Sequence, residues 1–242
     1  MKFRIALVTN QSLRHLYWAY ELYESQNVQL IIHPKVKNSF RSNIKSKIFG
    51  NGILWSVFKL LSLLYNKIFS KSMTRSLQKK EAIYFSGYEK KYASIPPQII
   101  RNVDSVNSDN THKLIKNNKI DIICFLGGQI AKRSLIESPN FLCLNYHSGI
   151  SPFYNGNKTI FHAVADNRPN FAGGTLMKMS ERIDGGKILS HFFPNISSQD
   201  TAADLFCKSI IGSVKLYNYF LSNIKVNKYN NSIKQKRSFK YL

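Results

Sequence analysis

The sequence predicts an α/β fold in which a mostly parallel sheet is flanked by helices. Its opening supplies the first observation. Phe3–Thr9 is an apolar run typical of a buried strand, Ser12–Glu24 has helical spacing of apolar residues, and Val28–Ile32 is strand-like again. A strand–helix–strand unit favours parallel pairing. The second observation is Ile120–Leu126, whose unbroken apolar character indicates a strand buried on both faces.

The remaining elements follow from the same patterns. The expected strands are Ile99–Val106, Phe141–Tyr146, Phe171–Met179 and Lys187–Phe193. The expected helices are Asn110–Asn117, Ala131–Glu137, Thr159–Asn167 and a closing helix at Tyr217–Phe220, followed by a basic tail over Lys234–Tyr241.

The composition excludes several classes of protein. With 242 residues, 43% of them hydrophobic, the chain can bury a sizeable core and does not have a disordered composition. Its three cysteines include no Cys-x-x-Cys pair, which argues against a disulfide framework and a cysteine zinc site and favours a reducing cytoplasm. No metal site is predicted. The opening MKFRIALVTN indicates a first strand rather than a signal peptide.

The formal net charge of +22 has two interpretations. It indicates either a polyanionic partner, such as nucleic acid, anionic lipid or a phosphorylated substrate, or a compositional bias toward Lys, Asn and Ile. The charge is concentrated between Ser25 and Lys80, which contain eleven Lys and Arg and no Asp or Glu.

A basic amphipathic helix is predicted inside this region, at Ile53–Phe69. It is too short, and too interrupted by Lys59 and Lys67, to span a membrane. It either packs on the body of the protein with its lysines in solvent or lies on an anionic membrane surface.

Chemistry-bearing residues gather at predicted strand ends. Asn145 and His147 are two residues apart on one strand, so their side chains point to the same face. Asp184 precedes two glycines in a predicted loop. Arg14 and His15 follow the first strand, where they either reach a ligand or only open the next helix, because ligands bind beyond the carboxyl ends of parallel strands.

One ordered combination of motifs resembles a known family. It consists of Asn145-x-His147, a Ser-Pro followed by an aromatic residue and Asn-Gly, a Gly-Gly-Thr strand, and Asp184-Gly-Gly. Across about Ile120–Leu189 this combination resembles the folate-dependent formyltransferases. That family includes the purine-pathway glycinamide ribonucleotide enzyme, methionyl-tRNA formyltransferase and the sugar N-formyltransferases. The resemblance implies a Rossmann-like sheet of the formyltransferase type and N10-formyltetrahydrofolate as cosubstrate.

The resemblance also implies roles for individual residues. Asn145 would hold the formyl oxygen, His147 would assist that oxygen or transfer a proton, and Asp184 would take the proton from the attacking amine. Further residues would bind the two substrates. For folate they are Leu126, Gly127, Gly128, Gln129, Ile130, Ile150, Gly156 and Gly185; for the acceptor they are Arg14, His15, Ser148 and Gly149.

Two positions depart from the family pattern. Met177 stands where many members carry a histidine, and Ser148–Pro152 replaces the usual Pro-Ser-Leu-Leu-Pro. Neither change removes Asn145, His147 or Asp184. Both indicate a distant branch of the family.

The acceptor is predicted by elimination and analogy. The loop NQSLRH differs from the Gly/Ser-rich phosphate loop of the purine enzyme, and Ser190–Leu242 is short for the C-terminal barrel of the tRNA enzyme. This leaves a nucleotide-linked or lipid-linked amino sugar for surface polysaccharides. The alternatives are a glycinamide ribonucleotide or methionyl-tRNA enzyme, a binding protein that has lost turnover, and a basic nucleic-acid-binding protein on the same fold.

The domain organisation follows from these assignments. Residues 1–190 are predicted to form the catalytic domain, with a basic helical insertion at about 35–80, and residues 191–242 a short extension packed on it. The expected location is the cytoplasm, with peripheral contact at the inner membrane face and a homodimer as open alternatives. Nucleic acid is not an expected partner.

Overall fold

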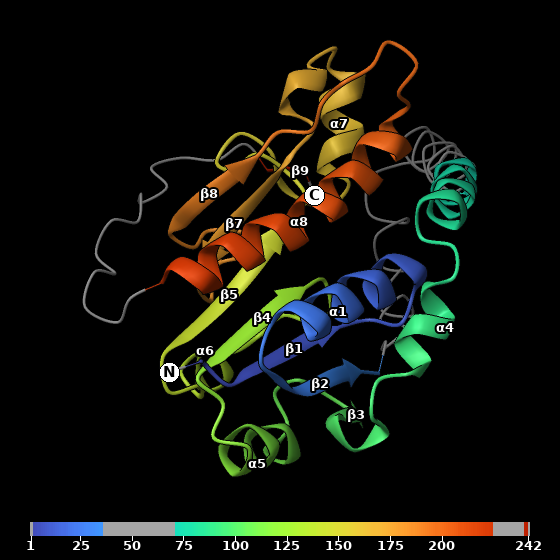
Figure 1. Cartoon of the computed structure of the whole chain (residues 1–242). Coiled ribbons are helices and arrows are strands. Elements are labelled where there is room, and N and C mark those ends of the chain that lie inside the picture. The colour runs from blue at the N-terminus through green and yellow to red at the C-terminus, as the bar shows by residue number, and fades with distance from the viewer. Residues whose placement is uncertain (1, 36–70, 225–239, 242) are drawn as a thin grey trace, which may run out of the picture.

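A computed structural model describes residues 2–35, 71–224 and 240–241 of the chain. A seven-stranded sheet with the order β3-β2-β1-β4-β5-β7-β8 lies at its centre, and helices cover both faces (Figure 1). Its strands are β1 (Ile5–Thr9), β2 (Val28–Pro34), β3 (Ile100–Val103), β4 (Ile122–Leu126), β5 (Leu142–His147), β7 (Gly174–Lys178) and β8 (Ile188–Phe192). The predicted α/β fold with flanking helices is confirmed.

One helix, over residues 71–84, overlaps the end of the predicted helical insertion at about 35–80 and continues beyond it. The others are α1 (Leu13–Ser25), α4 (Tyr88–Ala93), α5 (Asp109–Asn117), α6 (Arg133–Ile136), α7 (Thr159–Ala165) and α8 (Ala202–Asn223), with 3₁₀ turns at Pro97–Ile99 and Pro169–Phe171. Two short strands, β6 (Asn155–Gly156) and β9 (Lys240–Tyr241), form a separate parallel pair.

The direction of the strands changes at β5. Strands β3, β2, β1, β4 and β5 are parallel to one another, whereas β7 is antiparallel to β5 and β8 is antiparallel to β7. The register places Thr9 beside Leu126, and Leu126 beside Tyr146. The carboxyl ends of β1, β4 and β5 therefore meet along one edge, as the sequence predicted for a mostly parallel sheet.

Strands β1 and β4, at the centre of the parallel half, are buried on both faces. Along β1, Leu7 belongs to the core beneath α1 and α8, while Ala6 and Val8 belong to the core beneath α5 and α6. This alternation explains why the strand reads as a continuous apolar run rather than as alternating polar and apolar residues.

Helix α8 packs on the same face of the sheet as α1. It buries Cys207, Ile210 and Tyr217 in the core that also contains Leu7, and the Tyr217 hydroxyl donates to the Phe125 carbonyl at 2.7 Å. The predicted closing helix is the last part of this longer element. The predicted domain boundary near residue 190 falls inside β8.

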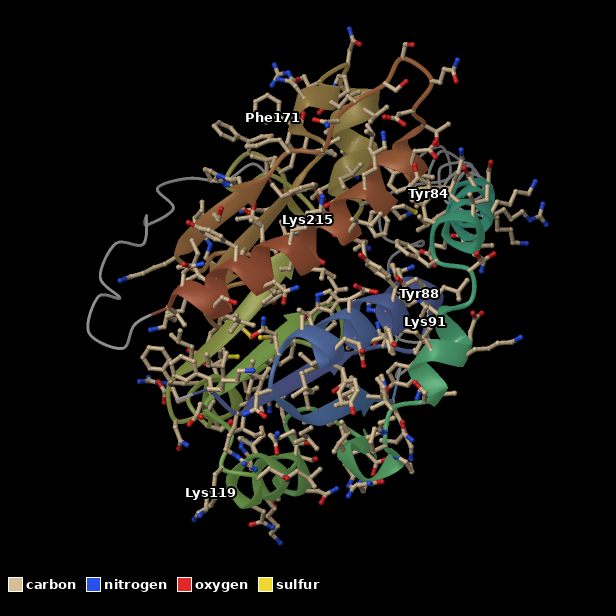
Figure 2. All side chains as sticks on the ribbon, viewed as in Figure 1. Tyr84, Tyr88, Lys91, Lys119, Phe171 and Lys215 are labelled. Atoms are coloured by element: carbon tan, nitrogen blue, oxygen red, sulfur yellow. The ribbon has the colours of Figure 1, made fainter. Side chains whose placement is uncertain are left out.

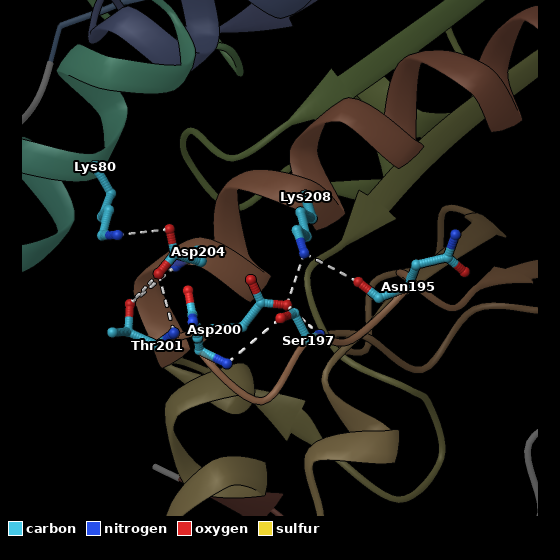
Figure 3. A network of polar contacts seen from close by, with 8 residues as sticks. Lys80, Asn195, Ser197, Asp200, Thr201, Asp204 and Lys208 are labelled. Atoms are coloured by element: carbon cyan, nitrogen blue, oxygen red, sulfur yellow. Dashed lines mark hydrogen bonds and ion pairs between the residues drawn. The ribbon is translucent and has the colours of Figure 1, made fainter.

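The helix at 71–84 is held to the body by ion pairs. Its Glu81 is buried and pairs with Arg14 of α1, and its Lys80 Nζ lies 2.8 Å from Asp204 Oδ1 at the start of α8 (Figure 3). Burial alone raises the pKa of Asp204. Hydrogen bonds from Lys80 and from Thr201, with which Asp204 forms a capping box, outweigh burial and lower that pKa to about 2.

Aromatic contacts continue this attachment along α4. Tyr84 ends the 71–84 helix, and Tyr88 and Lys91 lie on α4, beside α1 (Figure 2). The Tyr88 ring meets the Tyr17 ring edge-on at 4.8 Å between centroids, and Lys91 Nζ lies 4.3 Å from the Tyr88 ring centroid. The segment 71–93 is thus part of the packed body rather than a separate arm.

The predicted basic helix at Ile53–Phe69 lies outside the described residues, as does most of the predicted insertion at 35–80. In the described parts of the chain, no helix is both long and apolar enough to cross a membrane. Contact with an anionic membrane surface and formation of a homodimer remain predictions.

Candidate functional site

A cavity of about 330 Å³ opens at the carboxyl edge of β1, β4 and β5 and reaches the loop between β7 and β8. Most of the predicted site residues line it: Arg14, His15, Leu126, Gly127, Gly128, Gln129, Ile130, Asn145, His147, Ser148, Gly156 and Asp184. Gly149, Ile150 and Gly185 are not among the residues that line it. Its place agrees with the rule that ligands bind beyond the carboxyl ends of parallel strands.

Strand β5 presents Asn145 and His147 to this cavity. In the sheet register Asn145 lies opposite Met177 and His147 lies opposite Thr175. Among the described residues, no hydrogen bond occupies the side chain of Asn145, which is half-buried and lines the cavity. Its amide group is therefore available to a ligand.

His147 and Asp184 form the polar centre of the cavity wall. His147 Nδ1 lies 3.4 Å from Asp184 Oδ1, and both side chains are almost fully buried. His147 Nε2 lies 2.9 Å from the Tyr154 carbonyl oxygen, which can only accept, so Nε2 carries a hydrogen and donates. Nδ1 therefore faces the carboxylate and can exchange a proton with it.

Asp184 is also fixed by its backbone. Its carboxylate Oδ2 accepts a hydrogen bond of 2.9 Å from the Gly156 amide. Its φ of +48° lies in the left-handed region, which Asp and Asn adopt more readily than most residues. The β7–β8 loop thus turns sharply at Asp184 and directs the carboxylate toward β5.

Gly149 supports the site without lining the cavity. A Cβ atom at this position would lie 2.6 Å from His147 Nε2, 2.6 Å from the Tyr154 carbonyl oxygen and 2.7 Å from Thr159 Oγ1. Only glycine therefore permits the hydrogen bond between His147 and Tyr154. Thr175 holds the same loop, because its hydroxyl donates to the Gly149 carbonyl at 2.6 Å.

The glycine-rich loop after β4 forms another wall. Gly127 and Gly128 have φ values of +68° and +98°, which favour glycine. The Gln129 side chain anchors this loop, since its Oε1 accepts from the Val106 amide at 3.0 Å and its Nε2 donates to the Lys35 carbonyl at 2.8 Å. Backbone groups of the loop are thereby presented at the cavity.

Arg14 and His15 lie at the opposite end of the cavity from Asp184, where α1 begins. Arg14 pairs with the buried Glu81 and lies 5.5 Å from the centroid of the Phe206 ring. His15 is buried, and its Nδ1 lies 2.6 Å from Thr9 Oγ1. Burial, together with the nearby charge of Arg14, lowers the pKa of His15 to about 3, so the ring is neutral at neutral pH.

Several residues that line the cavity were not singled out from the sequence, among them Asn10, Lys158, Arg182 and Phe206. Lys158 and Arg182 lie two residues from predicted site residues, a signal that could have identified them. Phe206 comes from α8, and no local pattern connects it with the site.

Within residues 2–35, 71–224 and 240–241, no three His, Cys, Asp or Glu side chains gather closely enough to hold a metal ion.

Residues 66–210, which make up more than half of the chain, match a family model described as formyl transferase. Curated relatives match over a shorter region. The methionyl-tRNA formyltransferase of Agathobacter rectalis is 33% identical over 107 residues, 44% of this chain and 34% of that protein. That of Listeria monocytogenes serovar 1/2a is 34% identical over 87 residues, 36% of this chain and 28% of that protein. The chain spans about a third of the length of the curated relatives it matches.

Solved structures share the fold at low sequence identity. Glycinamide ribonucleotide transformylase 1 from Symbiobacterium toebii has a TM-score of 0.60 at 12% identity, covering 97% of this chain and 94% of that chain. A 4-N formyltransferase from Francisella tularensis has a TM-score of 0.57 at 18% identity, covering 99% and 76%. A sugar N-formyltransferase from Shewanella sp. FDAARGOS_354 has a TM-score of 0.56 at 15% identity, also covering 99% and 76%.

Proposed function

The chain belongs to the formyl transferase family, and we propose that it transfers a formyl group from N10-formyltetrahydrofolate to a primary amine. The observation that carries this proposal is the meeting of Asn145 with the His147–Asp184 pair at one cavity. The reaction needs a hydrogen-bond donor for a developing negative oxygen and an acceptor for an amine proton. These three side chains can supply both.

In the proposed reaction the amine nitrogen forms a bond to the formyl carbon, and the bond from that carbon to N10 of the folate then breaks. The tetrahedral intermediate carries negative charge on the former carbonyl oxygen. The Asn145 amide, which no described residue occupies, donates to that oxygen. Donors held in place before reaction stabilise such a charge most effectively, because little reorganisation is needed.

Asp184 takes the proton that the attacking nitrogen loses. The Gly156 amide and His147 hold its carboxylate in place on two sides. Asp184 returns this proton to N10 of the folate as the bond from N10 to the formyl carbon breaks. His147 can hold the proton at Nδ1 between these two steps while Nε2 remains bonded to Tyr154. This geometry supports proton transfer rather than direct contact with the formyl oxygen as the role of His147.

We propose that the pterin of the folate lies against the loop from Leu126 to Ile130. The positive φ values of Gly127 and Gly128 leave this backbone uncovered by side chains, which suits the edge and face of a flat heterocycle. Gly156 and the loop at Asp184 line the facing wall.

The acceptor we propose is the amine of a nucleotide-linked or lipid-linked amino sugar used for surface polysaccharides. The loop NQSLRH after β1 lacks the Gly/Ser-rich phosphate-binding pattern, which disfavours glycinamide ribonucleotide. The net charge of +22 suits a substrate that carries phosphate groups. Glycinamide ribonucleotide and methionyl-tRNA remain alternative acceptors, and binding of nucleic acid without catalysis is the alternative of a different class.

A turnover assay tests the proposal. The full chain is incubated with N10-formyltetrahydrofolate and, separately, with nucleotide-linked amino sugars, glycinamide ribonucleotide and methionyl-tRNA. Formylated product is detected by mass spectrometry, and Asp184→Asn serves as the matched inactive control. We expect formylation of at least one nucleotide-linked amino sugar, dependent on the intact carboxylate.

The outcomes separate the alternatives. Product only with glycinamide ribonucleotide or methionyl-tRNA would overturn the proposed acceptor and retain the reaction. No product with any amine, combined with salt-sensitive retention of RNA, would overturn the enzyme assignment.

A further inference from the structure

His15 is held rigidly at the end of the cavity nearest β1, and the reaction described above does not use it. The residue is 3% exposed and yet lines the cavity. Its Nδ1 is hydrogen-bonded to Thr9 Oγ1 at 2.6 Å, whereas no hydrogen bond from any described residue ends on Nε2. A buried imidazole therefore presents one uncommitted ring nitrogen to a binding cavity.

Thr9 Oγ1 lies between the His15 ring and strand β4. It is 2.6 Å from His15 Nδ1 and 3.0 Å from the Leu126 carbonyl oxygen, an oxygen that can only accept. When the single hydroxyl hydrogen of Thr9 is given to Leu126, Oγ1 accepts from His15 Nδ1 and Nε2 keeps a lone pair.

The surroundings keep the ring neutral. Burial lowers the pKa of His15 most, and Arg14 and His33 lower it further. These effects outweigh a backbone hydrogen bond with Leu126 that raises it, and the pKa is about 3. His33 is itself engaged, with Nδ1 donating to the Thr9 carbonyl at 2.8 Å and Nε2 within 2.6 Å of the Tyr92 hydroxyl. The burial that opposes a proton on His15 also opposes an unpaired ammonium group of a ligand at the same place.

Gly127 leaves the ring accessible from the cavity. A Cβ atom at this position would lie 3.0 Å from His15 Cε1 and 3.7 Å from Nε2, so any larger residue would crowd the ring edge that carries the uncommitted nitrogen. The φ of +68° at Gly127 is a second reason for glycine there.

We infer that Thr9 donates to Leu126, so that His15 Nε2 is a fixed hydrogen-bond acceptor that selects formyl acceptors carrying a hydroxyl group at this end of the cavity. The inference rests on the proposed function. β1 and β5 are separated by one strand, so this subsite lies about 10 Å from Asn145 by the usual strand spacing. The hydroxyl therefore belongs to a part of the acceptor remote from the reacting amine.

The tautomer is tested without any substrate. Long-range ¹⁵N–¹H NMR spectra of the labelled wild type distinguish a protonated from an unprotonated ring nitrogen, and His15→Phe identifies the signals. We expect hydrogen on Nδ1, a lone pair on Nε2 and no titration between pH 5 and 9. A hydrogen on Nε2, or protonation within that range, would overturn the inference.

The selectivity is tested with the best acceptor found in the turnover assay and its monodeoxy analogues. For His15→Phe we expect the KM of the hydroxylated acceptor to rise about 10- to 100-fold, the effect of leaving a buried donor unpaired, with the KM of the formyl donor unchanged. One monodeoxy analogue should have a raised KM with the wild type and no further rise with His15→Phe. Thr9→Val should shift the tautomer and raise the same KM, whereas His112→Phe, remote from the cavity, should change neither.

The two failures are distinguishable. If the wild type formylates no amine, the proposed function fails, and the NMR measurement still decides the state of His15. If turnover is normal and His15→Phe raises the KM of every monodeoxy analogue as much as that of the parent, His15 has only a structural role and the inference is wrong.

Discussion

Replacing Asp184 with asparagine removes one negative charge from the cavity wall and leaves its shape nearly unchanged. Asparagine adopts the left-handed backbone conformation that Asp184 requires at φ +48°. Its amide oxygen can still accept the hydrogen bond that the Gly156 amide gives to Asp184. The variant therefore isolates the charge and basicity of the carboxylate from its role in the loop.

The expected loss of rate follows from the distance between the Asp184 carboxylate and the His147 ring. At 3.4 Å, in surroundings with an effective dielectric constant of about 20, a carboxylate stabilises a protonated His147 by about 5 kcal/mol. Loss of a general base lowers rates by about 10²- to 10⁴-fold. Because the two estimates agree in order of magnitude, we expect the single-turnover rate constant of formyl transfer to fall by about 10²- to 10⁴-fold.

The assay is single-turnover formyl transfer at saturating concentrations of both substrates, combined with denaturant unfolding. The free energy of unfolding should change by less than about 1 kcal/mol in Asp184→Asn, since the Gly156 hydrogen bond is kept. Asp184→Ala should lose both the rate and part of the stability. Wild-type turnover in a folded Asp184→Asn variant would show that this carboxylate takes no proton in the reaction.

Three further perturbations address the support of the site and of the fold. Gly149→Ala places a Cβ atom 2.6 Å from the ring of the site histidine, so turnover should fall and the free energy of unfolding should decrease by about 1–3 kcal/mol. Wild-type turnover and an unchanged free energy of unfolding in Gly149→Ala would contradict this. Glu81→Gln breaks the buried ion pair with Arg14 and should destabilise the protein by about 1–3 kcal/mol. Its control, Glu137→Gln, breaks the exposed ion pair with Arg133 and should cost less than about 0.5 kcal/mol. Similar urea midpoints for the two variants would refute this ranking. Asp204 has a pKa of about 2 in the folded protein against an ordinary value of 3.8. As the pH falls, the unfolded chain binds the proton first, so the stability that ionised Asp204 contributes is complete above about pH 4 and is lost toward pH 2. Asp204→Asn should make the free energy of unfolding fall less steeply between pH 4 and pH 2, and an unchanged slope over that range would argue against this role.

The sequence predicted the strands that carry the site because their signal is local. Every residue of a run such as Ile122–Leu126 is apolar, so the strand can be recognised without knowing which strands it pairs with. Asn145 and His147 share a face for the same local reason, the two-residue period of a strand. These features do not depend on contacts made elsewhere in the chain.

The contact between His147 and Asp184 has a different origin. β6, α7 and β7 separate the two residues, and their meeting depends on the antiparallel pairing of β7 with β5. No periodicity in the sequence specifies that pairing. The pairing of Arg14 with Glu81 is similarly long-range, and no local pattern connects the two residues.

The start of α8 could have been found from the sequence. Thr201 and Asp204 have the spacing of a capping box, in which each side chain accepts a hydrogen bond from the backbone amide of the other residue. This local signal places the beginning of the helix well before Tyr217. The prediction missed it because only the aromatic residues near the end of the helix were used.

The short parallel pair of β6 and β9 has a practical consequence for work with this protein. It places Lys240–Tyr241 beside Asn155–Gly156, and Gly156 lines the cavity. The amino end of β1, by contrast, lies at the end of the strands that faces away from the cavity (Figure 1). A bulky group attached at residue 241 would therefore lie close to the cavity, whereas one attached at residue 3 would lie at the other end of the strands.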